Sequence, residues 1–126
     1  MLGANDLEQQ HYPSAVPGRL QRFQALYALR SVGVAFVPIG PAGPDHIHLW
    51  PEYEASRIET NRMLEEIVHG AVVVDIDALL ADLPPDVWHE GWHLFSDGYG
   101  TVGRRLGEAL SPRCQEIRRM APDVGA

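Results

Sequence analysis

The sequence contains one cysteine, no lysine and no long apolar run, and each of these absences excludes a class of protein. Cys114 is the sole cysteine among 126 residues, so a scaffold of intrachain disulfides is excluded. All ten basic residues are arginines, set against 17 acidic residues, and no arginine cluster is long enough to follow a phosphate backbone. Because the formal charge is -7, nucleic acid is not an expected partner.

The apolar segments are all much shorter than the roughly 20 residues that a membrane-spanning helix needs, so no membrane span is predicted. The segment Met1–Asp6 lacks the basic stretch and following apolar stretch of a secretion signal. We therefore expect a soluble chain without an export signal, cytoplasmic by default and otherwise of unknown compartment. The length predicts a single domain over residues 1–126 with a core that forms without disulfides or metals.

The spacing of apolar residues predicts alternating helices and buried strands. Helices are expected over 17–30, 53–69 and 98–110, and buried strands over 34–39 and 71–76. This order is typical of a three-layer α/β/α, flavodoxin-like fold with a parallel sheet. Because open parallel sheets usually have about four to six strands, the predicted sheet looks truncated at its N-terminal side.

Shorter elements are expected between and after these segments. A helical turn is predicted over 77–83, with Asp75 or Asp77 as its cap, and Ser96 is expected to cap the last helix. The composition of residues 40–51 predicts a proline-rich surface loop. The segment 111–126 is expected to be a flexible tail.

Chemically active residues follow the apolar runs, at the positions where parallel strands would end. Asn5 follows the first apolar fragment, and Glu90 and His93 lie beyond the last predicted strand. Ligands bind beyond the carboxyl ends of strands in open α/β sheets, so these side chains are expected to converge. An amide can donate to a developing oxyanion, and an imidazole oriented by a carboxylate can accept a proton from a hydroxyl. Together they would form part of an acyl-transfer site.

Two short blocks resemble the SGNH (GDSL-type) hydrolases, a family of serine esterases and lipases. Gly3–Asp6 is similar to the family's G-x-N-D block, and Glu90–His93, followed by Gly98 and Tyr99, is similar to its D-G-x-H…G-Y block. The helices and strands between the blocks recur in the family's order, so the similarity covers nearly the whole chain. The resemblance implies hydrolysis of a small-molecule ester, as an esterase, a lipase or a carbohydrate-ester deacylase, without metal or organic cofactor. It also implies that Asn5 is an oxyanion donor.

In the same resemblance His93 is the general base and Glu90 the acid that orients it. The family usually has aspartate at the position of Glu90, so Asp86 or Asp97 could substitute, and Asp6 is a possible accessory residue. The family's serine nucleophile belongs to a block that precedes G-x-N-D, where this sequence begins. None of the five serines has a G-D-S context: Ser14, Ser31, Ser56, Ser96 and Ser111. We therefore expect the chain to be inactive alone and to need a complementing N-terminal segment.

Two alternatives stay open from the residues themselves. The run His89–His93 matches H-E-x-x-H, which on a helix would bind zinc through His89 and His93 with Glu90 as base. Pro84, Pro85 and a glycine inside the motif disfavour that helix. The other alternative is a non-catalytic α/β interaction module whose incomplete sheet edge is covered by a partner chain or by a second copy, which predicts a homo-oligomer.

Overall fold

The computed structural model describes residues 15–45, 51–68 and 71–120. Its helices are α2 (Ala15–Ala28), α3 (Pro51–Ile67), α4 (Ile76–Leu80), α5 (Ser96–Leu110) and α6 (Cys114–Arg119). Its strands are β1 (Ala35–Phe36) and β2 (Val72–Val73), and two 3-10 turns are η1 (Pro85–Val87) and η2 (Ser111–Arg113). The predicted helices over 17–30, 53–69 and 98–110 are confirmed to within about two residues at most ends.

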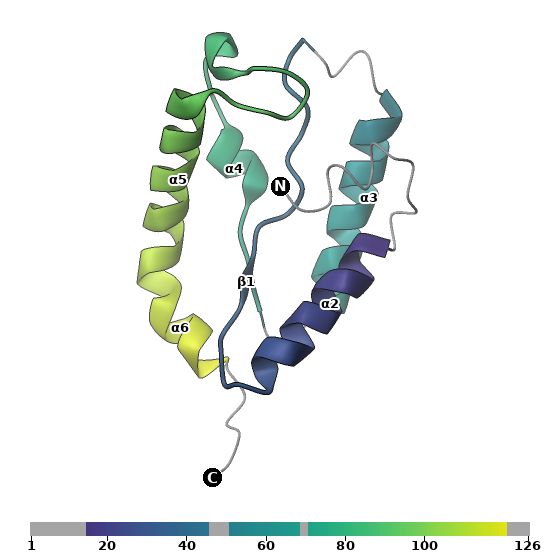
Figure 1. Cartoon of the computed structure of the whole chain (residues 1–126), viewed down its shortest axis with the longest axis vertical. Coiled ribbons are helices and arrows are strands. Elements are labelled where there is room, and N and C mark those ends of the chain that lie inside the picture. Colours follow the sequence, from purple (N-terminus) through teal and green to yellow (C-terminus); the bar gives the residue numbers. More distant parts are fainter. Residues whose placement is uncertain (1–14, 46–50, 69–70, 121–126) are drawn as a thin grey trace.

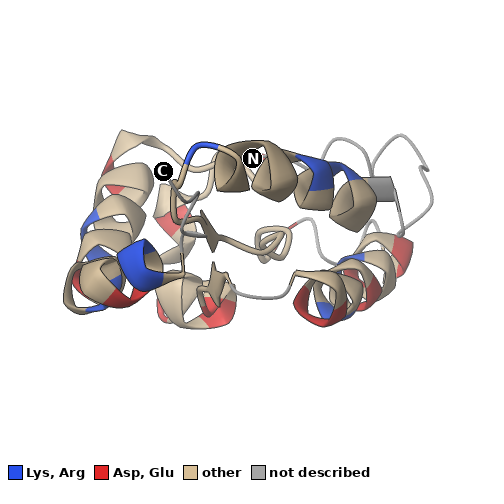
Figure 2. Ribbon diagram, turned by 90° about the horizontal axis from the view of Figure 1, so that it is seen from below, with Lys and Arg blue, Asp and Glu red and all other residues tan. Residues whose placement is uncertain are grey.

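The two strands form a small parallel sheet with helices on both sides. Ala35 pairs with Val72 and Phe36 with Val73, so the predicted parallel pairing is confirmed. Figures 1 and 2 show α5 on one side of the strands, with α2 and α3 on the other. The described residues thus form a mixed α/β structure, mostly helical, with a two-stranded parallel sheet.

The regular strands are much shorter than the predicted ranges 34–39 and 71–76. Pro38 has no backbone N–H to donate to a ladder. Just beyond it, the Ile39 N–H donates to Oδ1 of Asn61 at 2.9 Å, and Nδ2 of Asn61 donates back to the Ile39 carbonyl at 2.9 Å. The missing donor at Pro38 therefore ends the ladder between β1 and β2, and Asn61 of α3, rather than a strand, satisfies the backbone of Ile39.

Buried apolar side chains lie on both sides of the sheet and at its carboxyl end. Between the sheet and helices α2 and α3, Phe36, Leu64 and Val68 form one cluster. On the α5 side a second cluster comprises Val74, Ile76, Leu79, Leu80 and Leu94. The third, at the carboxyl end of β1, comprises Val16, Ile39, Ala42, Tyr53 and Trp92. This third cluster lies next to the candidate site.

Asp75 and Ser96 behave differently at the starts of the two following helices. Asp75 caps α4, because its Oδ1 accepts a hydrogen bond from the Ala78 N–H at 3.1 Å, which confirms the expectation. The prediction for Ser96 is wrong, since Ser96 is already the first helical residue of α5 and Phe95 occupies the N-cap without a side-chain cap bond. The Phe95 N–H donates to the Val87 carbonyl at 2.8 Å. This bond holds Phe95 in place, and the helix begins one residue earlier than expected.

The chain continues as helix where a flexible tail was expected. Turn η2 and helix α6 carry it from Ser111 to Arg119, so the prediction for 111–126 is wrong over these residues, and 121–126 lie outside the described residues. The guanidinium of Arg113 pairs with Glu116 at 2.9 Å within this segment. Helix α6 also closely approaches the chain before β1, where Gly33 faces the backbone of Ile117.

Replacing Gly33 by alanine is expected to displace α6. A Cβ atom at this position would lie 2.0 Å from the Ile117 carbonyl oxygen, which is backbone and cannot rotate away. We expect the free energy of unfolding in urea to fall by about 1–3 kcal/mol, with faster amide exchange over 114–119. Gly103→Ala is the matched control, because no atom lies within 4 Å of its Cβ position. Unchanged stability and exchange in Gly33→Ala would contradict this close approach.

Candidate active site

The residues Glu90–His93 form a tight turn between two short antiparallel segments. Trp88 pairs with Leu94 in an antiparallel bridge. The His89 N–H donates to the His93 carbonyl at 3.0 Å, and the His93 N–H donates to the Glu90 carbonyl at 2.8 Å. Gly91 has φ of 55°, a left-handed conformation that favours glycine. The backbone of the turn is therefore fixed by its own hydrogen bonds.

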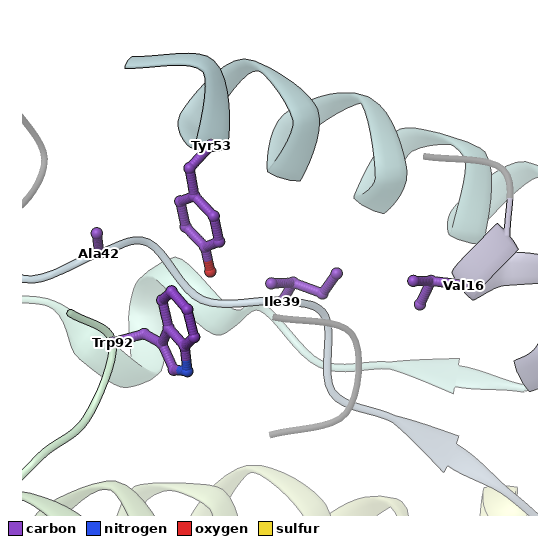
Figure 3. Close-up of a cluster of buried hydrophobic side chains, with 5 residues drawn as sticks. All are labelled: Val16, Ile39, Ala42, Tyr53 and Trp92. Carbon is purple, nitrogen blue, oxygen red and sulfur yellow. The ribbon is translucent and has the colours of Figure 1, made fainter. Parts of the chain in front are cut away.

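This turn is attached to the loop that follows β1. The Gly43 N–H donates to the Gly91 carbonyl at 2.6 Å. The buried ring of Trp92 stacks on Tyr53, at the start of α3, with ring centroids 5.3 Å apart (Figure 3). The Tyr53 hydroxyl donates to the Gly40 carbonyl at 2.9 Å. The turn thus lies at the carboxyl end of β1, where ligands of open α/β sheets bind.

Glu90 and His93 share this turn with their side chains exposed to solvent. The imidazole of His93 lies 5.8 Å from the ring centroid of Trp92, tilted by 34°. In the described part of the chain the carboxylate of Glu90 and the imidazole of His93 form no ion pair, and only their backbones are bonded. A carboxylate–imidazole contact therefore requires a change of side-chain rotamer, which exposed side chains make in picoseconds to nanoseconds.

The other acidic candidates flank the turn or lie outside the described residues. Asp86 is exposed in η1, and Asp97 is exposed in the first turn of α5. Neither carboxylate pairs with His93 within the described ranges. Asn5 and Asp6 lie outside the described residues, so the expected convergence of Asn5 with His93 stays a prediction.

The serines are distributed over several elements. Ser31 follows α2 with φ of 55°, Ser56 lies within α3, Ser96 begins α5 and Ser111 begins η2. Ser14 lies outside the described residues. Among residues 15–45, 51–68 and 71–120, no serine hydroxyl donates a hydrogen bond to the imidazole of His93. The expectation that none of these serines is the nucleophile stays a prediction.

The helix required by the zinc alternative does not form. His89 and His93 lie on opposite arms of the turn rather than on one helical face. The imidazole of His89 instead packs edge-on against Phe95, with ring centroids 4.8 Å apart. The described residues contain no group of three or more histidine, cysteine, aspartate or glutamate side chains that could hold a metal ion. The H-E-x-x-H interpretation is therefore wrong in requiring that residues 89–93 form a helix.

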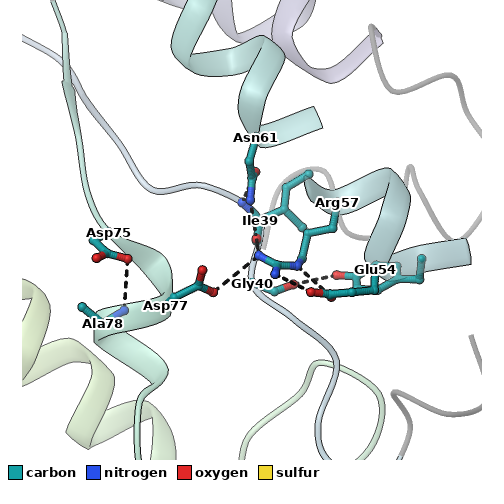
Figure 4. A network of polar contacts seen from close by, with 9 residues as sticks. Ile39, Gly40, Glu54, Arg57, Asn61, Asp75, Asp77 and Ala78 are labelled. Carbon is teal, nitrogen blue, oxygen red and sulfur yellow. Dashed lines mark hydrogen bonds and ion pairs between the residues drawn. The ribbon is translucent and has the colours of Figure 1, made fainter. Parts of the chain in front are cut away.

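A buried arginine beside the site was missed by the sequence analysis. Arg57 on α3 is 6% exposed, and its guanidinium pairs with Glu54 at 2.5 Å and with Asp77 at 3.5 Å (Figure 4). It also donates to the Ile39 carbonyl at 3.3 Å. The hydrogen bond to Glu54 is the main cause that raises the pKa of Arg57 above its ordinary value. This network ties α3 and α4 to the loop after β1.

The charge pattern of α3 gave no signal for this burial. The pair of Arg62 with Glu59 has the same three-residue spacing as the pair of Arg57 with Glu54, yet its side chains are about half exposed. A three-residue spacing of opposite charges predicts an ion pair on a helix, but it does not say which side of the helix is covered. The tertiary packing of α3 decides that point.

Because the phenol of Tyr53 is buried, we expect the protein to lose stability at alkaline pH. Burial raises the pKa of Tyr53 from 10.0 to about 12, because the phenolate would lose its hydration. The contribution of the neutral phenol to the free energy of unfolding is complete below pH 10 and is lost as the pH rises toward 12. We expect the free energy of unfolding to fall by roughly 2–3 kcal/mol over this interval, as measured by urea unfolding. Tyr53→Phe should lack this fall, whereas Tyr99→Phe, which alters an exposed ring, should keep it.

Comparisons with protein-family models, with curated proteins and with solved structures find no match to this chain. Within the described residues, every helix is too short or too polar to cross a lipid bilayer. Any functional conclusion therefore depends on the site geometry together with the two sequence blocks described above.

Proposed function

We propose that this chain supplies the base, the orienting acid and an oxyanion donor of an SGNH-type serine hydrolase acting on a small-molecule ester. The observation that carries the proposal is the attachment of the turn Glu90–His93 to the loop after β1, through Gly43 and Trp92. This attachment holds a solvent-accessible imidazole on a rigid element at the carboxyl end of the sheet. A preorganised base of this kind is what acyl transfer requires.

In the proposed mechanism a serine hydroxyl attacks the ester carbonyl while His93 accepts its proton. The imidazolium then returns the proton to the leaving alcohol, and water completes hydrolysis of the acyl-enzyme by the same route. Glu90 orients the imidazole and stabilises its charged form, with the side-chain rotation described above. Asn5 donates to the oxyanion of the tetrahedral intermediate.

The proposal assigns the nucleophile to a complementing N-terminal segment, because no described serine contacts His93. The same segment would complete the flavodoxin-like, three-layer arrangement that the two parallel strands begin. An acyl-enzyme cannot form without an activated hydroxyl. Under this proposal the 126-residue chain binds an ester without turning it over.

Labelling with a fluorophosphonate probe tests the proposal. We expect no labelling of the chain expressed from Met1, and stoichiometric labelling of a serine when the coding sequence upstream of Met1 is included. The longer protein should also hydrolyse p-nitrophenyl acetate. A longer product that is folded yet neither labelled nor active would contradict the proposed function.

A non-catalytic interaction module is the second candidate, and the outer surface of α2 favours it. Phe23 and Leu26 on α2 are 51% and 60% exposed, and Leu29, directly after the helix, is 73% exposed, so large apolar side chains face solvent in one short stretch. Light scattering across a range of concentrations distinguishes the candidates. A concentration-dependent dimer that disappears in Leu26→Glu would favour the module, whereas a monomer at all concentrations would count against it.

A further inference from the structure

The solvent-facing side of α2 carries arginines and large apolar side chains together. Residues three and four positions apart lie on the same face of a helix. The exposed members of this face, which we call the α2 stripe, are Arg19, Arg22, Phe23, Leu26 and, in the turn after the helix, Arg30. Val16 and Leu20 instead pack on the core, which fixes α2 to the rest of the molecule. The α2 stripe is therefore presented to solvent by a well-anchored helix.

Positive charge collects on this part of the chain, although the protein as a whole is acidic. Residues 15–44 contain three arginines and no acidic residue, whereas the complete chain has 17 acidic residues and a formal charge of -7. Figure 2 shows blue but no red on α2, whereas α3 and α5 carry both colours. The α2 stripe is thus a local positive surface on a negatively charged protein.

The arginines of the α2 stripe differ in their partners from arginines elsewhere. The following arginines each pair with a glutamate three or four residues away: Arg57, Arg62, Arg104 and Arg113. Over the described ranges, Arg22 and Arg30 form no ion pair, because α2 and the turn after it offer no carboxylate. Their charge is therefore left for a partner outside this chain.

Further arginines lie at the end of the molecule where α2 ends. Gly33, in the chain after α2, faces the backbone of Ile117 on α6, and Figure 1 shows both helices ending there. Arg118 and Arg119 form the last turn of α6 and are exposed. Positive charge thus extends from the α2 stripe to this end of the molecule.

A partner of the α2 stripe must be anionic and must also accept apolar side chains. A symmetric dimer uses the same surface of both copies, so it would set arginines against arginines. A small anion would neutralise charge but would leave Phe23 and Leu26 in water. The surface of an anionic bilayer supplies both negative headgroups and an apolar boundary beneath them.

We propose that the α2 stripe docks this protein on the surface of anionic phospholipid bilayers. Helix α2 lies parallel to the bilayer, with Phe23 and Leu26 at the boundary between headgroups and acyl chains. The apolar stems of Arg22 and Arg30 extend along this boundary, and their guanidinium groups reach the lipid phosphates. Because the lipids repel the acidic remainder of the protein, only this face approaches them. Docking does not depend on any esterase activity.

Vesicle flotation with the 126-residue chain tests the docking. We expect binding to phosphatidylcholine vesicles that contain about 30% phosphatidylserine to be at least 10-fold tighter than binding to vesicles of phosphatidylcholine alone. Raising the salt concentration from about 0.1 M to about 0.5 M should weaken this binding, because salt screens the attraction.

A double arginine variant tests the charged part of the stripe. We expect Arg22→Gln with Arg30→Gln to weaken binding to the phosphatidylserine vesicles about 20- to 30-fold. Arg62→Gln with Arg104→Gln is the matched control, since it makes the same charge change at exposed arginines on α3 and α5. The control should bind within about threefold of the parent protein, because neither arginine is on α2.

A leucine variant tests the apolar part of the stripe. Leu26→Gln should weaken binding about 10-fold, because the side chain no longer gains from leaving water. Ile58→Gln on α3 is its control, since Ile58 and Leu26 are 56% and 60% exposed, and it should bind like the parent protein. Urea unfolding of all variants shows that each is folded.

Several results would overturn the docking proposal. Equal affinity for the two kinds of vesicle, or binding to neither, would show that anionic lipid is not the partner. Equal losses in the α2 variants and their controls would place binding elsewhere on the surface. Tighter binding to soluble poly-glutamate than to vesicles would indicate an acidic polypeptide instead. A dimer that forms without vesicle binding and disappears in Leu26→Gln would show that a second copy covers α2.

Discussion

Replacing His93 by alanine is expected to lower kcat for p-nitrophenyl acetate by about 10³-fold or more in the protein that includes the complementing segment. The members of a catalytic triad act as a unit, so loss of the base removes most of the rate acceleration that the nucleophile provides. Substrate binding should change little, because the imidazole acts on the serine proton rather than on the ground-state ester. The measurement is steady-state hydrolysis, with kcat and KM determined separately.

His89→Ala is the matched control for this prediction. His89 is also exposed and directly precedes the turn, but its imidazole packs on Phe95 and has no role in the proposed mechanism. We expect its kcat to stay within about threefold of the parent protein. Equal losses in the two variants would instead indicate damage to the turn, and parent-like activity of His93→Ala would remove His93 from the mechanism.

Replacing Trp92 by alanine is expected to lower the free energy of unfolding by about 3–5 kcal/mol. Trp92 is 4% exposed and stacks on Tyr53, so its removal leaves a cavity between the turn, the loop after β1 and α3. Because Trp92 is the neighbour of His93, the turn should also lose its fixed position, and hydrolytic activity should fall with the stability. Urea unfolding measures the loss of stability.

Tyr99→Ala provides the comparison for Trp92→Ala. Its ring is 48% exposed on α5, so we expect a loss of about 1 kcal/mol or less. A Trp92→Ala variant as stable as Tyr99→Ala would mean that the stacked pair does not hold the turn. The proposed rigidity of the site would then have no structural basis.

The helices and the parallel pairing followed from the sequence because they depend on local periodicity. The apolar stripe of residues 53–69 predicted α3, and the two short apolar runs predicted neighbouring parallel strands. The strand ends did not follow, because the side chain of Asn61 reaches Ile39 from another element. The helix after Ser111 was missed because arginine and proline were interpreted as breaks, whereas Pro112 lies in the first turn of a helical segment, where proline is tolerated.

The candidate site was predictable only in its local part. Glu90 and His93 are close in the sequence, so their sharing one turn follows from the motif. The placement of that turn beside Gly43 and Tyr53 depends on contacts between segments about 40 to 50 residues apart, which no local pattern encodes. Packing is the commoner role of tryptophan, and Trp92 has that role here.

A distance between residues 5 and 93 tests the account most directly. Spin labels on Asn5→Cys and His93→Cys, in a Cys114→Ser background, report this distance by pulsed electron resonance. We expect a narrow distribution centred below about 20 Å, since a chain of this size is only about 35 Å across. A distribution centred near 30 Å or beyond would place the amide and the imidazole at opposite ends of the molecule and contradict the hydrolase assignment.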